Sequence, residues 1–113
     1  MYLGQKVTVV LPAYNAANTL EATYNEIPFD LVDEVILCDD ASTDHTTELA
    51  ESLRIDKLIR HKSNRGYGAN QKSLYKLALD GGADIIIMLH PDYQYTPKLI
   101  PALLSLVGMQ VYS

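Results

Sequence analysis

Acidic and polar side chains that could bind or transform a ligand gather at three places in the sequence. Asp39 and Asp40 close one apolar run, residues 90–94 follow another, and residues 12–15 follow a third. Carboxylates placed in this way coordinate hard divalent cations or accept hydrogen bonds from a nucleobase and from sugar hydroxyls. A phosphate site made by protein alone would need glycines and cations at these places instead. The residue types therefore predict a metal ion or a ligand rich in hydrogen-bond donors.

The elements that must position these side chains follow from the spacing of the apolar residues. Continuous apolar runs at residues 7–12, 34–39 and 83–89, with a shorter one at 56–60, predict buried strands. Apolar residues at helical spacing lie between and after these runs. The alternation predicts one α/β domain over residues 1–113, an open and mainly parallel sheet with helices on both faces. The run at 83–89 is apolar on both faces, so we expect it at the centre of the sheet.

All three groups of polar residues directly follow predicted strands. Parallel strands end at one edge of their sheet, and ligands of such sheets bind outside that edge, near the point where the strand order reverses. We therefore expect the side chains of Asp40 and Asp92 to share one edge of the sheet.

Composition excludes several classes of protein. A net charge of -5 argues against a nucleic-acid-binding surface, which needs a basic patch. Cys38 is the single cysteine and lies in an apolar run, so we expect a buried free thiol. Neither a membrane-spanning segment nor a signal peptide is recognisable in the sequence. These observations favour a cytoplasmic protein.

Four motifs, in order along the chain, lie at or near the predicted strand ends. They are residues 7–15 (VTVVLPAYN), 38–44 (CDDASTD), 64–70 (NRGYGAN) and 90–94 (HPDYQ). Together they resemble the family 2 glycosyltransferases, whose second strand commonly ends in DDGSTD and whose metal site is a DxD motif. The resemblance extends from about residue 7 to residue 98.

The resemblance implies a GT-A fold, with a Rossmann-like nucleotide-binding half, and a nucleoside-diphosphate sugar carrying UDP or GDP. By this resemblance Asp40 would accept a hydrogen bond from the base, with Asp39 beside it near the ribose. Arg65 would approach the phosphates, and Pro12 and Tyr14 would line the nucleoside pocket. The implied nucleotide-sugar site consists of Pro12, Tyr14, Asn15, Asp39, Asp40, Arg65 and Asp92.

The resemblance also implies a divalent metal ion. Asp92 would coordinate Mg²⁺ or Mn²⁺, with Gln94 as a second ligand, and the metal would stabilise the departing nucleoside diphosphate. The first aspartate of the motif is replaced by His90, a better ligand for Mn²⁺ than for Mg²⁺. His90 is therefore either a further metal ligand or a residue that only hydrogen-bonds its loop.

Three smaller expectations concern the loops. Ala41 stands where the family usually has glycine, and we expect an ordinary backbone angle there. Asp44 is expected to cap the following helix. His45 and His61 are expected on the surface.

The catalytic domain of this family continues well beyond the length of this sequence. By the resemblance, its second half supplies the acceptor site and a general base, so we expect no catalytic residue here and a truncated chain. Residues 92–94 resemble the dolichol-phosphate-mannose-synthase branch, which implies a polyprenyl phosphate acceptor and a peripheral place at the inner membrane face. A saccharide acceptor is the alternative. An uncovered sheet edge would favour self-association.

Three other functions fit parts of the pattern. A non-catalytic nucleotide-binding module would carry the same motifs. A phospho-receiver domain has a similar strand order, but its acidic pair follows the first strand, whereas Asp39 and Asp40 follow the second. A nucleotidyltransferase would have a glycine-rich, basic loop after its first strand, and residues 12–15 contain neither glycine nor a cation.

Overall fold

Strands and helices alternate along the chain in the computed structural model, which describes residues 1–91 and 96–110, the last five by their backbone alone. In chain order the elements are β1 (Val7–Ala13), α1 (Leu20–Asn25), β2 (Glu34–Asp39), α2 (Thr46–Ser52), β3 (Lys57–Arg60), α3 (Tyr67–Asp80), β4 (Ile85–Met88), the 3₁₀ turn η1 (Pro97–Leu99) and α4 (Ile100–Gln110). The predicted order of strands and helices is confirmed.

The four strands form one parallel sheet in the order β3-β2-β1-β4. From β1 the chain adds β2 and β3 on one side and then crosses to the other side of β1 to form β4. The strand order therefore reverses between β1 and β4, which is where open parallel sheets bind their ligands.

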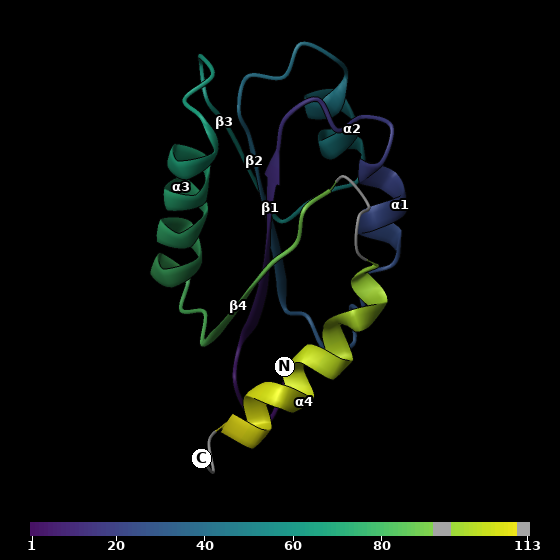
Figure 1. Ribbon diagram of the computed structural model, residues 1–113, viewed down its shortest axis with the longest axis vertical. Helices are drawn as coiled ribbons and strands as arrows, with labels where there is room; N and C mark the ends of the chain where they lie inside the picture. The colour runs from purple at the N-terminus through teal and green to yellow at the C-terminus, as the bar shows by residue number, and fades with distance from the viewer. Residues whose placement is uncertain (92–95, 111–113) are drawn as a thin grey trace.

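Helices cover both faces of this sheet, as predicted (Figure 1). Side chains of β1 alternate between the two faces with the period of a strand. Val9 and Leu11 pack with residues of α1, α2 and α4, whereas Val10 packs with Leu74 and Ala78 of α3. Two apolar layers thus sandwich the sheet and fix its carboxyl edge. None of the helices in the described residues is long and apolar enough to cross a bilayer.

The expected central position of the run at 83–89 is wrong. β4 is an edge strand, with β1 as its partner in the described sheet. Its side chains are apolar on both faces because Ile86 and Met88 pack on the α3 layer while Ile87 packs on the opposite layer. Coverage from above and below, rather than a strand on each side, explains the apolar pattern.

Leu74 is the fully buried leucine by which α3 packs onto the sheet. Leu74→Ala leaves a cavity in that layer, so we expect the free energy of unfolding to fall by about 2–5 kcal/mol. The matched control is Leu79→Ala on the same helix, where the side chain is 63% exposed and the change should stay within about 0.5 kcal/mol. Urea unfolding followed by circular dichroism measures both. Equal losses would show that α3 does not pack by this face.

Candidate nucleotide site

The carboxyl ends of β1, β2 and β4 bring the predicted site residues to one edge of the sheet. Ala13 lies opposite Asp39 in the register of β1 and β2. The Asp40 N–H donates to the Ala13 carbonyl oxygen at 2.9 Å. β4 pairs with β1 on its other side, so His90 reaches the same edge. Asp40 and His90 thus share this edge, whereas Asp92, which was expected to share it with Asp40, lies outside the described residues.

Asp40 is a buried charged group whose carboxylate is held by hydrogen bonds at this edge. Its carboxylate is 4% exposed and accepts the backbone N–H groups of Arg65 at 2.8 Å and Gly66 at 2.9 Å, with the His61 ring nitrogen Nδ1 at 2.8 Å. Desolvation raises the pKa of this carboxyl, but the bonds from Arg65, His61 and Gly66 together hold the pKa below its ordinary value of 3.8. Asp40 is therefore a fixed, ionised acceptor at neutral pH.

The expected surface position of His61 is wrong, since it is only 6% exposed. His61 follows β3. Its backbone N–H donates to the Asp39 carbonyl oxygen at 2.9 Å, which continues the pairing of β3 with β2. That register turns the ring inward against Asp40. A single polar residue after a weak strand gives no sequence signal for this placement.

Asp39 has a different environment from its neighbour. It is fully buried, and its carboxylate accepts bonds from the hydroxyl groups of Ser42 and Thr47, with the Arg60 Nε at 3.6 Å. All of these partners belong to the β2–α2 loop, α2 or β3. Asp39 thus holds the loop together, and its predicted place near a ribose stays a prediction.

The loops after β1 and β2 are joined by hydrogen bonds. The Asn15 N–H donates to Ser42 Oγ at 2.8 Å, and the Asn15 side-chain oxygen accepts the Thr43 N–H at 2.9 Å. Ala41 has φ 60°, so the expected ordinary backbone angle is wrong. The chain must turn sharply here because Asp40 is tied to β1 while Ser42 is tied to Asn15. This is the left-handed region that favours glycine.

Asp44 binds the first turn of α2 as expected of a cap, although it lies one residue before the N-cap position, which His45 occupies. Asp44 accepts the N–H of Thr46, in the first turn of α2, at 3.0 Å, and also the Ala17 N–H at 3.2 Å. Desolvation raises the pKa of Asp44, but the bonds from Thr46 and Ala17 bring the pKa below its ordinary value. Asp44 is a second tie between the β1 and β2 loops.

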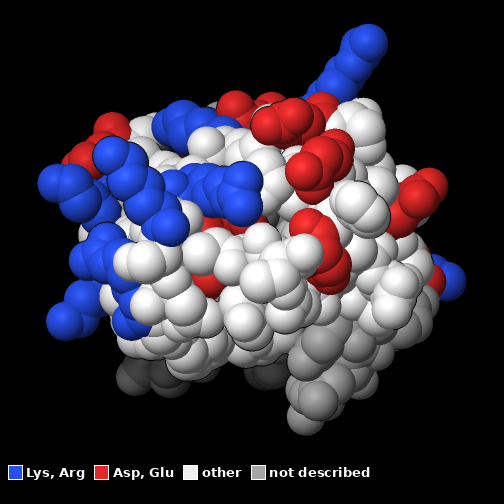
Figure 2. All heavy atoms as spheres, turned by 90° about the horizontal axis from the view of Figure 1, so that it is seen from above, with Lys and Arg blue, Asp and Glu red and all other residues white. Residues whose placement is uncertain are grey.

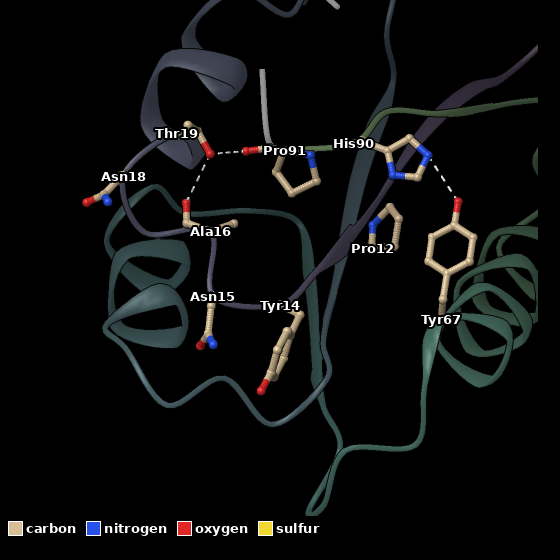
Figure 3. Close-up of a pocket in the computed structure, with 9 residues that line it drawn as sticks. All are labelled: Pro12, Tyr14, Asn15, Ala16, Asn18, Thr19, Tyr67, His90 and Pro91. Atoms are coloured by element: carbon tan, nitrogen blue, oxygen red, sulfur yellow. Dashed lines mark hydrogen bonds between the residues drawn. The ribbon is translucent and has the colours of Figure 1, made fainter. Parts of the chain in front are cut away.

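Two neighbouring hollows open at this edge, sharing Pro12, Tyr14 and Tyr67. The Asp40 pocket, of about 190 Å³, is lined by Pro12, Ala13, Tyr14, Asp40, Asn64, Gly66, Tyr67 and Asn70. The His90 pocket, of about 410 Å³, is lined by Pro12, Tyr14, Asn15, Ala16, Asn18, Thr19, Tyr67, His90 and Pro91. Figure 3 shows Tyr14 and Tyr67 on the two sides of Pro12. Both tyrosines are 51% exposed, so their rings are free to contact a flat ligand.

Among the residues of the Asp40 pocket that sequence reasoning missed, three have polar side chains: Asn64, Tyr67 and Asn70. The motif at residues 64–70 was the available signal, because it places all three in and after the turn that leads into α3. Asn70 is buried, and its amide donates to the Cys38 carbonyl oxygen at 3.0 Å. This bond fastens α3 to the end of β2.

The backbone and the side chain of Arg65 contact different parts of the molecule. Its N–H binds Asp40, whereas its side chain is exposed and lines a separate hollow with Lys72 and Lys76 on α3. Figure 2 looks onto the carboxyl edge and shows cations gathered toward the α3 side and several carboxylates toward the other side. The predicted approach of the Arg65 guanidinium to phosphates stays a prediction.

His90 is exposed at the mouth of its pocket. Its Nε2 lies 3.0 Å from the Tyr67 hydroxyl, and the two rings stack with their centroids 5.5 Å apart. The other two predicted metal ligands, Asp92 and Gln94, lie outside the described residues. Within residues 1–91 and 96–110, three or more His, Cys, Asp or Glu side chains are nowhere grouped as a metal site. His90 therefore fits a metal ion only as one member of a larger set of ligands.

The lowered pKa of Asp40 makes stability depend on pH in a defined direction. The unfolded state takes up a proton first as the pH falls, so the stabilisation is complete above pH 4–5 and is lost as the pH falls through the folded pKa. At pH 6, Asp40→Asn should lower the free energy of unfolding by about 1.5–3 kcal/mol, because an amide nitrogen would face buried N–H donors. The loss should be smaller at pH 3.

Urea unfolding at both pH values measures this difference, with Asp30→Asn at an exposed loop position as the control. An equal loss at pH 3 and pH 6 would contradict an ionised Asp40.

The amino-acid sequence is similar to those of known sugar transferases. A dolichol-phosphate mannosyltransferase of Pyrococcus furiosus is 29% identical in an alignment 108 positions long, which covers 90% of this chain and 30% of that protein. An undecaprenyl-phosphate 4-deoxy-4-formamido-L-arabinose transferase of Aeromonas hydrophila is 35% identical, over 94% of this chain and 34% of the relative. The chain spans about a third of the length of these curated relatives.

Solved structures show the same fold. Glucosyl-3-phosphoglycerate synthase from Mycobacterium tuberculosis, crystallised with Mn²⁺, UDP and glucosyl-3-phosphoglycerate, superimposes with a TM-score of 0.75 at 28% identity, over 92% of this chain and 40% of that one. The four-stranded sheet and its helices thus have a GT-A fold over the part of the neighbour that they match. Residues 8–108 match the family described as glycosyl transferase family 2, and the chain belongs to that family.

Proposed function

We propose that this chain binds the nucleoside-diphosphate sugar of a glycosyltransferase. The observation that carries the proposal is Asp40, a buried and ionised carboxylate held at the strand-order reversal and facing a pocket flanked by two tyrosines. The structurally similar glucosyl-3-phosphoglycerate synthase was crystallised with UDP and Mn²⁺, which supports the proposal. The whole protein would transfer a sugar from this donor to a polyprenyl phosphate or a saccharide.

Asp40 has the hydrogen-bonding capacity to recognise a base. A carboxylate offers about four lone-pair positions, and Asp40 uses two on Oδ1 and one on Oδ2. The remaining position on Oδ2 would accept one N–H from the edge of a base. Uracil and guanine both present a ring N–H there, so the proposed donor carries UDP or GDP.

Tyr14 and Tyr67 would hold the base by ring contacts. Both side chains line the Asp40 pocket and are half exposed, so a planar base can cover them and remove apolar surface from water. Pro12 would form the floor between them. The ribose and phosphates would then extend toward the His90 pocket, which shares all three residues and is the larger of the two hollows.

A divalent metal ion is part of the proposal. Asp92 and Gln94, with His90 as a third candidate, would hold Mn²⁺ or Mg²⁺ beside the phosphates, and the imidazole favours Mn²⁺. When bound, the ion supplies positive charge that stabilises the leaving nucleoside diphosphate. The exposed His90 side chain at the mouth of its pocket is consistent with this role.

The acceptor site and the general base are proposed to lie in the part of the relatives that this chain does not cover. No catalytic residue is therefore assigned here, and the chain alone is expected to bind the donor without transferring sugar. The dolichol-phosphate and undecaprenyl-phosphate transferases among the relatives favour a lipid-linked acceptor. We therefore propose that the whole protein acts at a membrane surface, on its cytoplasmic face. The edge of β4 that β1 leaves unpaired is the proposed place for self-association.

A thermal-shift experiment tests donor binding. A ligand at about one hundred times its Kd stabilises the native state by about 2.7 kcal/mol, on the order of 10 °C in Tm for a chain of this size. We expect this rise with UDP or GDP plus Mn²⁺. Asp40→Asn should abolish the rise, Asp92→Asn should remove only its metal-dependent part, and Asp30→Asn should keep it whole.

The folded, unaltered chain must first be verified by circular dichroism. If neither UDP nor GDP then changes its Tm, with or without Mn²⁺, the proposed function is wrong.

A further inference from the structure

A buried histidine contacts the Asp40 carboxylate without lining the Asp40 pocket. The His61 ring contacts the Asp40 carboxylate through Nδ1 at 2.8 Å, and its Nε2 lies 3.0 Å from the Ser73 hydroxyl and 3.5 Å from the Cys38 sulfur. His61 is not among the residues that line the Asp40 pocket, so it reaches a ligand there only through Asp40.

The partners of the ring fix the position of its protons. Because Asp40 is ionised, Nδ1 must carry a hydrogen and donate it to Oδ1. The Ser73 hydroxyl can then donate to the lone pair of Nε2. Burial raises the pKa of the Cys38 thiol to about 11, so the sulfur is a neutral and weak partner. Ser73 on α3 thereby orients the ring from the far side.

Oδ1 and Oδ2 of Asp40 are not equivalent as a result. Oδ1 receives both His61 Nδ1 and the Arg65 N–H, whereas the Gly66 N–H is the one donor to Oδ2 among the residues that the structure describes. Without the imidazole, the carboxylate would lose one of the two bonds that hold Oδ1 in place. Its plane could then rotate, and Oδ2 would no longer be held in one direction.

We propose that His61 is a positioning residue that sets base selectivity, because its Nδ1–H holds Asp40 so that Oδ2 keeps a free lone pair for a base N–H. This inference rests on the proposed nucleotide binding. Ser73 is the second positioning group, since it fixes the ring that fixes the carboxylate.

Ser73, His61 and Asp40 also stand in the order of a hydrolytic triad, and the structure argues against that use. A serine nucleophile needs N–H donors for the oxyanion that develops. Ser73 lies in the middle of α3, where the neighbouring backbone N–H groups are taken by helical hydrogen bonds. Asp40 in turn is fastened to the backbone of the loop before α3. The arrangement orients a carboxylate instead of activating a hydroxyl.

Substitution of His61 by asparagine or by glutamine tests the roles of the two ring nitrogens one at a time. Asparagine places its amide N–H near the position of Nδ1, whereas glutamine places one near Nε2. The readout is the ratio of Kd values for an N-methylated nucleotide and its parent, measured by calorimetry with Mn²⁺. The pairs are 3-methyl-UDP with UDP and 1-methyl-GDP with GDP, because methylation removes the ring N–H that Oδ2 would accept.

In the unaltered chain we expect the parent nucleotide to bind about 10- to 100-fold more tightly than its methylated analogue, as for one hydrogen bond to a charged group. In the His61→Gln variant this ratio should fall to roughly threefold or less. In the His61→Asn variant it should stay close to that of the unaltered chain, because the asparagine amide replaces the Nδ1–H. A loss of packing alone would weaken both nucleotides equally and leave the ratio unchanged. Ser73→Ala should lower the ratio by a smaller factor.

An unchanged ratio in folded His61→Gln would overturn the inference while leaving the proposed function intact. Should the His61 variants not fold, Ser73→Ala decides, since an unchanged ratio there would also overturn it. If the unaltered chain binds neither UDP nor GDP, the proposed function fails, and this inference fails with it.

Discussion

The buried charge of Asp40 is the constraint on which the rest of this edge depends. A carboxylate removed from water costs several kcal/mol unless hydrogen bonds replace its hydration. Here the replacements come from the residue after β3 and from the loop that leads into α3. β2, β3 and α3 must therefore all reach the same point for the charge to be tolerated. The need to satisfy one side chain thus brings residues 61–66 to the end of β2, although they follow Asp40 by 21 to 26 positions in the sequence.

The two adjacent aspartates, Asp39 and Asp40, have different roles at the carboxyl edge of the sheet. Asp39 turns toward hydroxyl groups of its own loop and toward Arg60, and this fixes the path between β2 and α2. Asp40 turns toward backbone N–H groups and lines a pocket. Asn15 then ties the β1 loop to the β2 loop. An ionised acceptor held by backbone groups in this way is preorganised, so binding a base would need little rearrangement.

Much of this arrangement was predictable because it follows from periodicity and strand direction. Apolar runs predicted the strands, and the parallel order brought their carboxyl ends to one edge. The edge position of β4 was not predictable from the sequence. A strand covered by helices on both faces has apolar residues throughout, whether it lies at the edge or at the centre of the sheet. The φ of Ala41 and the burial of His61 were also missed, because both arise from hydrogen bonds between loops that no local pattern records.

The central claim is that a nucleotide binds over Asp40 at the reversal point of the sheet. The most direct measurement is the change in backbone amide NMR shifts of the ¹⁵N-labelled chain on addition of UDP or GDP with Mg²⁺, which avoids paramagnetic broadening. The account predicts that the amides of Arg65 and Gly66, which donate to Asp40, and that of Tyr14 show the largest changes. Changes confined to other parts of the chain, such as the groove that Leu99 and Leu103 line beside β4, would contradict it.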